Sequence, residues 1–421
     1  MANSLCAEYN STSVSRLTDK TVVLGVGGGI AAYKAAEITR LLVQRGAKVR
    51  VMMTPNAREF ITPLTLQTLS QNPVATDTFS LTEESQIGHI RLADAADLIL
   101  IAPATADLIA KAAVGIADDL VTTVLLATRA KVAFAPAMNV HMYAHPTVQG
   151  NLATLRSRGI SIFEPGEGDL ACGYEGKGRL EDPSIIVEEL ERMLAPRDLE
   201  GQRILVTAGP TQEAIDPVRF VSNRSSGKMG FAIARAAVAR GAEVRMVAGP
   251  SSLPTPRAVE RFDTVSAAEM LGVTSQNFPW CTALVMAAAI ADFRPANPAS
   301  NKLKKNSRGL DLKMVSIADE LPRLAAKRGS RVMIGFAAET NDLEANARDK
   351  LKRKGLDLIV ANDVTQEGAG FGVDTNIVTL ITPDGVALSH PKLSKDGVAD
   401  LILDRLVSIH ASKHRRLRAV R

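Results

Sequence analysis

The chain has 421 residues, too many for one comfortable hydrophobic core, so we expect two domains of roughly 200 residues each. Apolar residues make up 46% of the chain and charged residues 23%, a balance that excludes a largely disordered protein. The formal net charge is only +5, and five of the cations fall in residues 413–421, so the basic balance indicates a solvated tail rather than a nucleic-acid-binding surface.

The cysteines and the apolar runs bear on the compartment. Three cysteines stand far apart, at Cys6, Cys172 and Cys281, which suggests no disulfide framework and favours a reducing compartment, by default the cytoplasm. The first 20 residues lack the apolar core of a signal peptide, and no apolar run approaches the roughly 18 residues of a membrane-spanning helix. We therefore expect no membrane partner and no nucleic-acid partner.

The first regular unit follows a predicted flexible extension over residues 1–19. It reads as a strand over residues 21–26, a glycine turn, a helix over residues 30–45 and a strand over residues 48–53. Strand, helix and strand in this order predict a βαβ unit.

A second unit of the same kind begins after residue 202. It has a strand over residues 203–207, a helix over residues 229–240 and a strand over residues 243–247. Both units contain the phrase Arg-Gly-Ala-x-Val-Arg, at residues 45–50 and 240–245, where the glycine ends a helix in the left-handed conformation. Two units imply two separate sheets.

Continuous apolar runs suit parallel strands that are buried on both faces. Such runs cover residues 98–102, 131–135, 283–288 and 356–361. Pro196 and several polar residues interrupt the chain near residue 198, where we place the domain boundary. We therefore predict an α/β fold of two Rossmann-like domains with mainly parallel sheets. The first domain covers residues 20–197, the second residues 198–408, and a basic tail residues 409–421.

The glycine turn at residues 27–29 is the first candidate ligand site, because ligands of open α/β sheets lie beyond the carboxyl ends of the strands. Its backbone can hold a phosphate at the start of the following helix. Ile30 stands where a dinucleotide motif needs Gly or Ala, and the second strand ends without an acid for the ribose. The pattern favours a mononucleotide over NAD, with a tight turn that binds nothing as the alternative.

His89 and a glycine-rich segment are two further candidate functional features of the first half. His89 lies just before an expected strand and is either a core residue or an acid–base group. Residues 164–183 are rich in glycine around Cys172 and show neither helical nor strand period. Long loops of this kind are usually lids or linkers, and a linker seldom carries a cysteine at its centre.

Five motifs of the first half resemble the flavin-dependent phosphopantothenoylcysteine decarboxylases. They are Gly-Gly-Ile-Ala-Ala-Tyr-Lys at 28–34, Gly-His-Ile at 88–90, Ala-Pro-Ala-Thr-Ala-Asp at 102–107, Pro-Ala-Met-Asn at 136–139 and Ala-Cys-Gly at 171–173. The resemblance implies FMN as cofactor. It also implies that the substrate thiol is oxidised to a thioaldehyde, after which the neighbouring carboxylate leaves as CO₂ and the hydride is returned.

The resemblance also assigns residues. Cys172 would protonate the enethiolate left after CO₂ departs, His89 would assist substrate oxidation, and Asn139 would hold the substrate carboxylate. The chain departs from the family at Gly27, where bacterial relatives often carry Ser or Cys. The FMN contacts that the resemblance implies are Gly28, Gly29, Ile30, Thr54, Ala102, Pro103, Ala104 and Thr105.

The second half contains a sequence like a phosphate loop, Ser-Asn-Arg-Ser-Ser-Gly-Lys-Met-Gly at 222–230. Its glycine spacing is not that of a Walker motif, so it either binds phosphate or simply caps a helix. Asp292 follows the strand at residues 283–288, and Lys302, Lys304 and Lys305 follow in a loop. These lysines are either solvated or bind a triphosphate. In the second case Asp292 would bind a sugar or a metal ion.

Here the chain resembles the phosphopantothenate–cysteine ligases. The matching phrases lie at 208–211, 222–230, 287–292, 335–340 and 361–363. The resemblance implies CTP and Mg²⁺: the carboxylate of 4′-phosphopantothenate attacks the α-phosphate, and the amine of cysteine displaces CMP from the acyl-cytidylate. Asn223 would contact that intermediate, while the Mg²⁺ ligands stay unassigned. The nucleotide contacts would be Met286, Ala287, Ala288, Asp292, Lys302, Phe336, Lys350 and Lys354.

Together these features predict a flavoprotein-type decarboxylase domain followed by a ligase domain, acting on 4′-phosphopantothenate, cysteine and CTP in coenzyme A biosynthesis. The rivals are a binding module that lost catalysis and an NAD(P)-dependent oxidoreductase. One further departure lies at residues 317–320, where many relatives read Asn-Pro-Asp-Ile. By resemblance, trimers of the first domain and dimers of the second would combine into a homododecamer.

Overall fold

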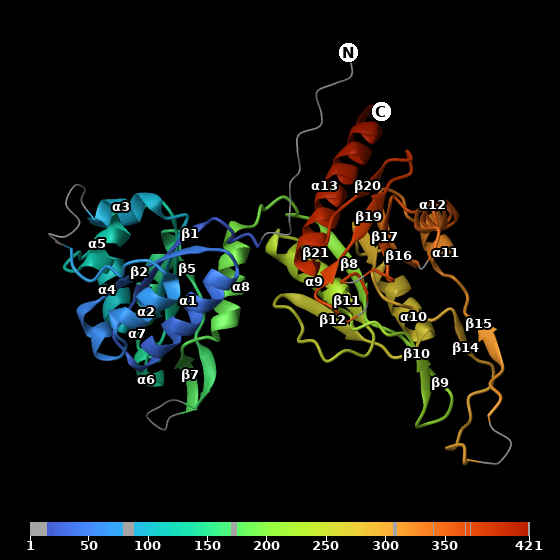
Figure 1. Cartoon of the computed structure of the whole chain (residues 1–421), viewed down its shortest axis with the longest axis horizontal. Helices are drawn as coiled ribbons and strands as arrows, with labels where there is room; N and C mark the ends of the chain where they lie inside the picture. Colours follow the sequence, from blue (N-terminus) through green and yellow to red (C-terminus); the bar gives the residue numbers. More distant parts are fainter. Residues whose placement is uncertain are drawn as a thin grey trace. The chain divides into compact units, whose positions relative to one another are not determined.

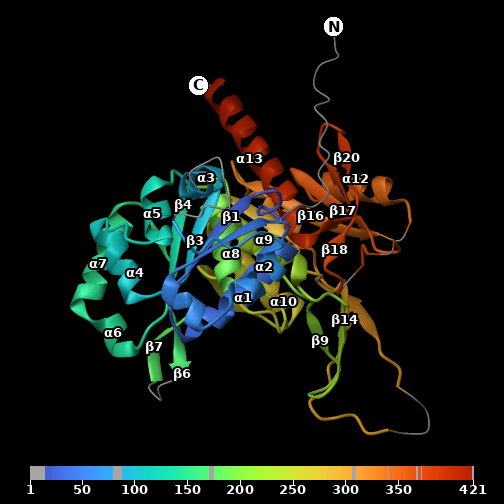
Figure 2. The ribbon, with the colours of Figure 1, turned by 60° about the vertical axis from the view of Figure 1, so that its left-hand side comes forward.

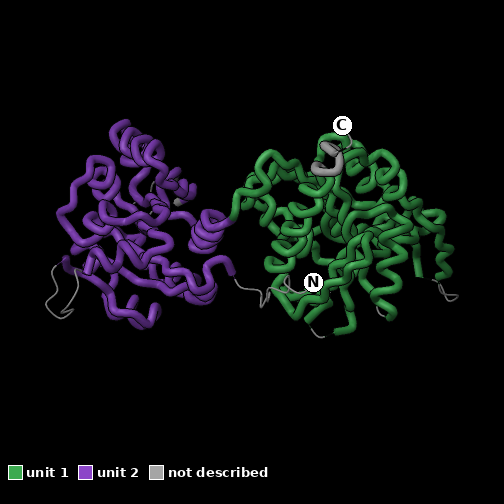
Figure 3. Tube along the Cα trace, turned by 90° about the horizontal axis from the view of Figure 1, so that it is seen from above, with its two compact units in different colours: residues 1–13, 196–421 green, residues 14–195 purple. Residues whose placement is uncertain are grey.

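The computed structural model describes residues 15–78, 88–169, 175–305, 310–339, 341–366, 368–370 and 372–419. The chain divides into two compact units, and the division falls between Ala195 and Pro196 (Figure 3). None of the described helices is long and apolar enough to cross a membrane.

The first domain is built on a five-stranded parallel sheet in the order β2-β1-β3-β4-β5 (Figures 1 and 2). β3 has every residue buried, as the continuous apolar run predicted. The strands are β1 (Thr21–Val26), β2 (Lys48–Met53), β3 (Leu98–Ala104), β4 (Lys131–Pro136) and β5 (Ser161–Ile162).

Helices cover both faces of this sheet because each face presents apolar side chains. Ile38 of α1, Leu66 of α2 and Ile186 of α8 belong to the core on one face. Leu92 of α3 and Val121 of α5 belong to the core on the other, together with residues of α4 and α7. The helices are η1 (Ile30–Tyr33), α1 (Lys34–Gln44), η2 (Pro55–Glu59), α2 (Pro63–Ser70), α3 (Gly88–Ala95), α4 (Ala106–Val114), α5 (Leu120–Ala127), α6 (Val140–Ala144), α7 (Pro146–Ser157) and α8 (Pro183–Leu194).

The second domain has an eight-stranded sheet in the order β12-β11-β8-β13-β16-β17-β19-β20. The first six strands are parallel, whereas β19 and β20 pair antiparallel at one edge. The strands are β8 (Arg203–Ala208), β11 (Glu243–Ala248), β12 (Val259–Asp263), β13 (Ala283–Met286), β16 (Val332–Glu339), β17 (Leu358–Asp363), β19 (Val378–Ile381) and β20 (Ala387–Ser389). The predicted α/β class with mainly parallel sheets is confirmed for both domains.

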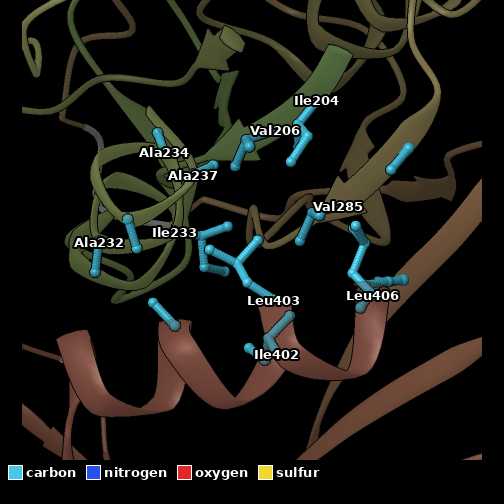
Figure 4. Close-up of a cluster of buried hydrophobic side chains, with 14 of the residues drawn as sticks. Ile204, Val206, Ala232, Ile233, Ala234, Ala237, Val285, Ile402, Leu403 and Leu406 are labelled. Carbon is cyan, nitrogen blue, oxygen red and sulfur yellow. The ribbon is translucent and has the colours of Figure 1, made fainter. Parts of the chain in front are cut away.

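Two helices pack on one face of this sheet and three on the other. Figure 4 shows Ile233 of α9 and Leu403 of α13 packed with Val206 and Val285 of the strands. α10, α11 and α12 contribute to the opposite core. The helices are α9 (Lys228–Ala239), α10 (Ala267–Asn277), α11 (Leu321–Ala326), α12 (Leu343–Arg353) and α13 (Lys395–Ala419). Short two-stranded ribbons complete the domain: β9 (Gln212–Ala214) with β10 (Phe220–Ser222), β14 (Phe293–Pro295) with β15 (Met314–Ser316), and β18 (Thr375–Asn376) with β21 (Leu393–Ser394).

Both predicted ends of the chain need correction. Leu17 is fully buried in the core of the first domain, so the loose extension does not reach residue 19. Residues 409–419 are the last turns of α13, and Lys413 Nζ lies 2.8 Å from an oxygen of Asp357, a buried residue just before β17. Lys413 is therefore not a purely solvated residue of the tail, because it pairs with an acid of the folded domain, which sequence position alone does not reveal.

Two local predictions in the first domain were also wrong. Residues 164–183 contain a β-hairpin of β6 (Gly166–Asp169) and β7 (Glu175–Arg179), followed by the start of α8. The sequence did not predict this hairpin, because its strands consist of glycines and charged residues and so lack the apolar alternation of a typical strand. His89 lies in helix α3 rather than in the approach to a strand.

Two candidate active sites

The first domain has a cavity of about 860 Å³ at the carboxyl ends of its parallel strands. This volume lies in the range of small-molecule sites, and the place is the one that open α/β sheets use. Residues that follow four different strands meet on its wall. The predicted residues that line it are Gly28, Gly29, Ile30, Thr54, Pro103, Thr105 and Asn139.

The glycine turn after β1 is packed against neighbouring backbone. The Gly27 N–H donates to Pro103 O at 3.1 Å, and a Cβ at this position would lie 2.5 Å from the same oxygen. Gly28 has equally little room, because its Cβ would collide with Asn56. The departure at Gly27 therefore fits this chain, in which any side chain would push the turn away from β3.

Three polar side chains of the wall cap helices. Thr54 Oγ1 accepts from the Ala57 N–H at 3.2 Å, and Thr105 Oγ1 accepts from the Leu108 N–H at 3.3 Å. Asn139 caps α6 in the same way. Each cap fixes a side-chain direction. Because the two threonine hydroxyls act as acceptors here, each retains its hydrogen for donation to a ligand.

The wall also carries a group of acidic side chains, which lie on α4 and in the turn before α5. Lys111 Nζ lies 3.2 Å from Asp107 and 3.0 Å from Asp118. The hydrogen bond with Asp118 is the largest cause of the raised pKa of Lys111, so this ammonium stays charged. Asp119 caps α5 and lines the cavity as well. Three carboxylates thus share this part of the wall with one cation.

Several predicted residues of the first site do not line the cavity. Ala102 and Ala104 are fully buried within β3, behind the wall. His89 is not on the wall either, and its Nδ1 is buried without a hydrogen-bond partner among the residues that the structure describes. Cys172 lies outside the described residues.

The second domain has a cavity of about 450 Å³, again beside the carboxyl ends of the parallel strands. The loop before α9 forms one side, where Gly227 adopts a φ of +83° and Ser225 Oγ accepts the Gly227 N–H at 3.3 Å. Asn223 Nδ2 donates to Ala289 O at 3.0 Å and ties this loop to the segment after β13. The predicted residues on the wall are Asn223, Met286, Ala287, Ala288, Asp292, Phe336, Lys350 and Lys354.

Lys350 and Lys354 extend from the same face of α12. Lys354 Nζ forms an ion pair with Asp319 at 3.1 Å, whereas no ion pair within 4 Å involves Lys350 in the described part of the chain. Burial, and then repulsion by Lys354, lowers the pKa of Lys350. An anion in the cavity would relieve both effects. Asp319 belongs to the stretch that departs from the family at residues 317–320, and this stretch lines the cavity.

Lys302, also predicted to contact the nucleotide, is not among the described residues that line this cavity. It lies exposed in the loop between β14 and β15. The prediction came from the resemblance to the ligases, and the contact of Lys302 with nucleotide stays a prediction.

Sequence reasoning missed several charged residues of the two walls. Lys228 Nζ lies 2.6 Å from Asp374 and 2.9 Å from Gly372 O, and Lys395 also lines the second cavity. In the first cavity the missed cations are Lys34, Lys111 and Arg179. Lys34 belongs to the quoted glycine motif, which was the available signal. Lys395 and Arg179 reach the walls only through the tertiary fold.

The fold and the two cavities define a class: a protein of two α/β domains, each with a cavity of ligand size at the carboxyl ends of its parallel strands. Residues 10–195 match the family described as Flavoprotein, and residues 199–409 match the DNA/pantothenate metabolism flavoprotein C-terminal domain. The "Coenzyme A biosynthesis bifunctional protein CoaBC" of Bacillus subtilis is 49% identical over 93% of this chain and 98% of its own. That of Escherichia coli K12 is 48% identical over 95% of this chain and 100% of its own.

Two solved structures are similar to single domains. The C-terminal domain of a coenzyme A biosynthesis bifunctional protein CoaBC covers 51% of this chain and 99% of its own at 38% identity, with a TM-score of 0.45. A mutant "PPC decarboxylase", described as "complexed with pantothenoylaminoethenethiol", covers 42% and 98% at 29% identity, with a TM-score of 0.38.

The chain therefore belongs to the family of bifunctional coenzyme A biosynthesis proteins. It is an enzyme with a flavoprotein decarboxylase domain and a ligase domain, as the sequence motifs predicted.

Proposed function

We propose that the second domain uses CTP to join cysteine to 4′-phosphopantothenate, and that the first domain, with FMN bound, decarboxylates the product to 4′-phosphopantetheine. The observation that carries the proposal is the gathering of the motif residues on two separate cavities, each at the carboxyl edge of its own parallel sheet. The order of reaction is then opposite to the order of the domains in the chain.

In the second domain the chemistry needs an activated carboxylate, because a free carboxylate is a poor acceptor for an amine. The first turn of α9, which begins at Lys228 on the cavity wall, offers backbone N–H groups to the phosphates of CTP. Lys350 adds a half-buried positive charge, which stabilises the charge that develops as pyrophosphate leaves. Asn223, fixed through Ala289, holds the acyl-cytidylate.

Mg²⁺ is proposed as the partner of the triphosphate. In such sites the ion is held by one or two carboxylates together with substrate phosphates. Asp292 is the carboxylate of the matched motif on the cavity wall, so it is the proposed contact.

In the first domain the residues present fit FMN. The wall combines a side-chain-free turn at Gly28–Gly29 with two hydroxyls that can donate to a phosphate. FMN, when bound, supplies a reversible hydride acceptor. The chain's own residues orient the substrate: the amide of Asn139, held by the α6 cap, binds the substrate carboxylate next to the small residues after β3. Proton donation by Cys172 and assistance by His89 stay predictions.

Assembly into a homo-oligomer is proposed as well. Ile30, Tyr33 and Met142 line the first cavity and are 64%, 58% and 48% exposed, which is unusual for large apolar side chains beside a site. A second copy of the first domain is the proposed cover, and a dodecamer is the expected state. Light scattering of the purified chain would measure it, and a monomer would contradict the proposal.

One experiment tests the whole reaction sequence. Purified, FMN-loaded protein is mixed with CTP, Mg²⁺, 4′-phosphopantothenate and cysteine, and pyrophosphate and CO₂ are measured together. We expect equal amounts of both, with 4′-phosphopantetheine as product, and no pyrophosphate when Mg²⁺ is chelated. Release of CO₂ in the absence of CTP would refute the proposed order of the two reactions. So would continued release of pyrophosphate with no product formed from cysteine.

A further inference from the structure

Lys34 is a buried cation on the wall of the first cavity. It begins α1, and only 9% of the residue is exposed. Its Nζ donates to Leu180 O at 3.3 Å. Among the described residues, no carboxylate oxygen lies within 4 Å of this ammonium.

A buried ammonium with one long hydrogen bond lacks the compensation that buried charges normally have. Burial is the largest cause that lowers the pKa of Lys34, and repulsion by Arg179 is the next. Asp182, Glu37 and Glu181 act in the opposite sense with smaller effect. The net result is positive charge at the cavity wall that an anion would stabilise.

Arg179 is the second cation of this wall. It ends β7, has no ion pair within 4 Å among the described residues and lines the same cavity. Its place is fixed by its neighbour Gly178, whose carbonyl accepts from the Met138 N–H at 3.0 Å. The guanidinium therefore comes from a strand that is held against the segment carrying Asn139.

The charges of the cavity are separated. Lys34 and Arg179 come from α1 and β7, whereas Asp107, Asp118 and Asp119 come from α4 and from the turn before α5. An anionic group that enters the cavity is attracted to the first pair and repelled by the second group. The Gly28–Gly29 turn and the threonine caps form a separate place for the phosphate of a flavin.

We propose that Lys34 and Arg179 form a phosphate-monoester subsite, and that it binds the phosphate of the 4′-phosphopantothenoyl substrate rather than that of the flavin. The inference rests on the decarboxylase activity proposed above. Two cations beside one dianion form charge-assisted hydrogen bonds, which arginine can make in a bidentate manner. This subsite would make the first domain select the phosphorylated substrate.

The test compares Lys34→Met and Arg179→Gln in the FMN-loaded full chain. We measure kcat/KM for 4′-phosphopantothenoylcysteine and for its dephosphorylated form by CO₂ release. Each variant should lower the preference for the phosphorylated form roughly 10- to 100-fold, mainly through KM. Calorimetry with 4′-phosphopantetheine and with pantetheine should show the same loss of preference in binding.

The matched control is Lys177→Gln. Lys177 lies two residues before Arg179 on β7, but its Nζ pairs with Glu164 at 2.7 Å, so the preference should stay at the wild-type value. Arg179 is exposed, so Arg179→Gln tests the proposal even if Lys34→Met fails to fold.

Titration of flavin-free protein with FMN and with riboflavin separates the two phosphate sources. The proposal requires that both variants keep the wild-type ratio of FMN to riboflavin affinity. A fall in that ratio with an unchanged substrate preference would assign the subsite to the flavin and overturn the proposal, as would no change in either ratio. Wild-type protein that releases no CO₂ would instead refute the decarboxylase function itself.

Discussion

The two cavities form at the same edge of two similar sheets, yet they hold their charges differently. In the first, two carboxylates pair with Lys111 while Lys34 is buried with one backbone hydrogen bond. In the second, four lysines line the same cavity, and two of them, Lys354 and Lys228, pair with Asp319 and Asp374. The fold determines where the cavity lies, whereas side chains from distant segments determine the charge of the cavity wall.

Backbone contacts also differ between the two sites. The first presents a glycine turn with helix caps, which suits a cofactor that stays bound. The second presents a loop before α9 and a set of lysines, which suits a triphosphate that is bound, cleaved and released. The two sites are therefore expected to function independently, so that a variant in one should leave the other unchanged.

The largest expected effect is that of Cys172→Ser. If Cys172 protonates the enethiolate, CO₂ release in multiple turnovers should fall roughly 100- to 10,000-fold, the usual contribution of a general acid. Pyrophosphate release by the second domain should keep its wild-type rate. Normal CO₂ turnover would remove Cys172 from its role, and a parallel loss of pyrophosphate release would show that the sites are coupled.

The next effect concerns the stability of the second domain. Arg240 is 2% exposed and pairs with Asp198 at 2.6 Å and Asp404 at 2.7 Å. Asp198→Asn combined with Asp404→Asn leaves a buried guanidinium without these carboxylates, and should lower the free energy of unfolding by about 3 kcal/mol. Arg240→Met should cost less, because it removes the buried charge itself.

Trp280 is the single tryptophan of the chain and lies in the second domain, so its fluorescence in a urea titration reports this transition. Flavin release reports the first domain and should not shift. A larger loss for Arg240→Met than for the double variant would contradict the reasoning.

A smaller effect is expected for nucleotide binding. Lys350→Met should raise the KM for CTP roughly 10- to 100-fold, because a charge-assisted contact with phosphate is lost. The affinity for FMN should not change. Lys352→Met is the matched control, since Lys352 is exposed on the same helix and should leave the KM as in wild type. An unchanged KM in Lys350→Met would place the triphosphate elsewhere.

The smallest effect is a pH dependence. Because burial and Lys354 lower the pKa of Lys350, its ammonium loses the proton at a lower pH than an ordinary lysine, whose pKa is about 10.4. Affinity for CTP should therefore fall as the pH rises, beginning at a lower pH than the titration of an ordinary lysine would give. Calorimetry at rising pH should show the fall in wild type and a weaker one in Lys350→Met.

Much of the first cavity was predictable from residues that follow strands. Gly28, Thr54, Thr105 and Asn139 line one cavity, because the carboxyl ends of parallel strands meet at one edge and turn residues next to them are local in sequence. The same reasoning placed Asp292 and Phe336. His89 and Lys302 line neither cavity among the described residues, because His89 lies in helix α3 and Lys302 in the loop between β14 and β15.

The sequence by itself determined the class of fold, the two-domain division of function and the motif residues at the strand ends, since periodicity and turn chemistry are local properties. Only the tertiary structure decided which charges face a ligand. Lys34 is buried because the segment between β7 and α8 packs against the start of α1. Arg179 lines the same cavity from the β6–β7 hairpin, which the sequence did not predict. Burial and charge neighbourhood are sums over segments far apart in the chain, so local sequence patterns do not determine them.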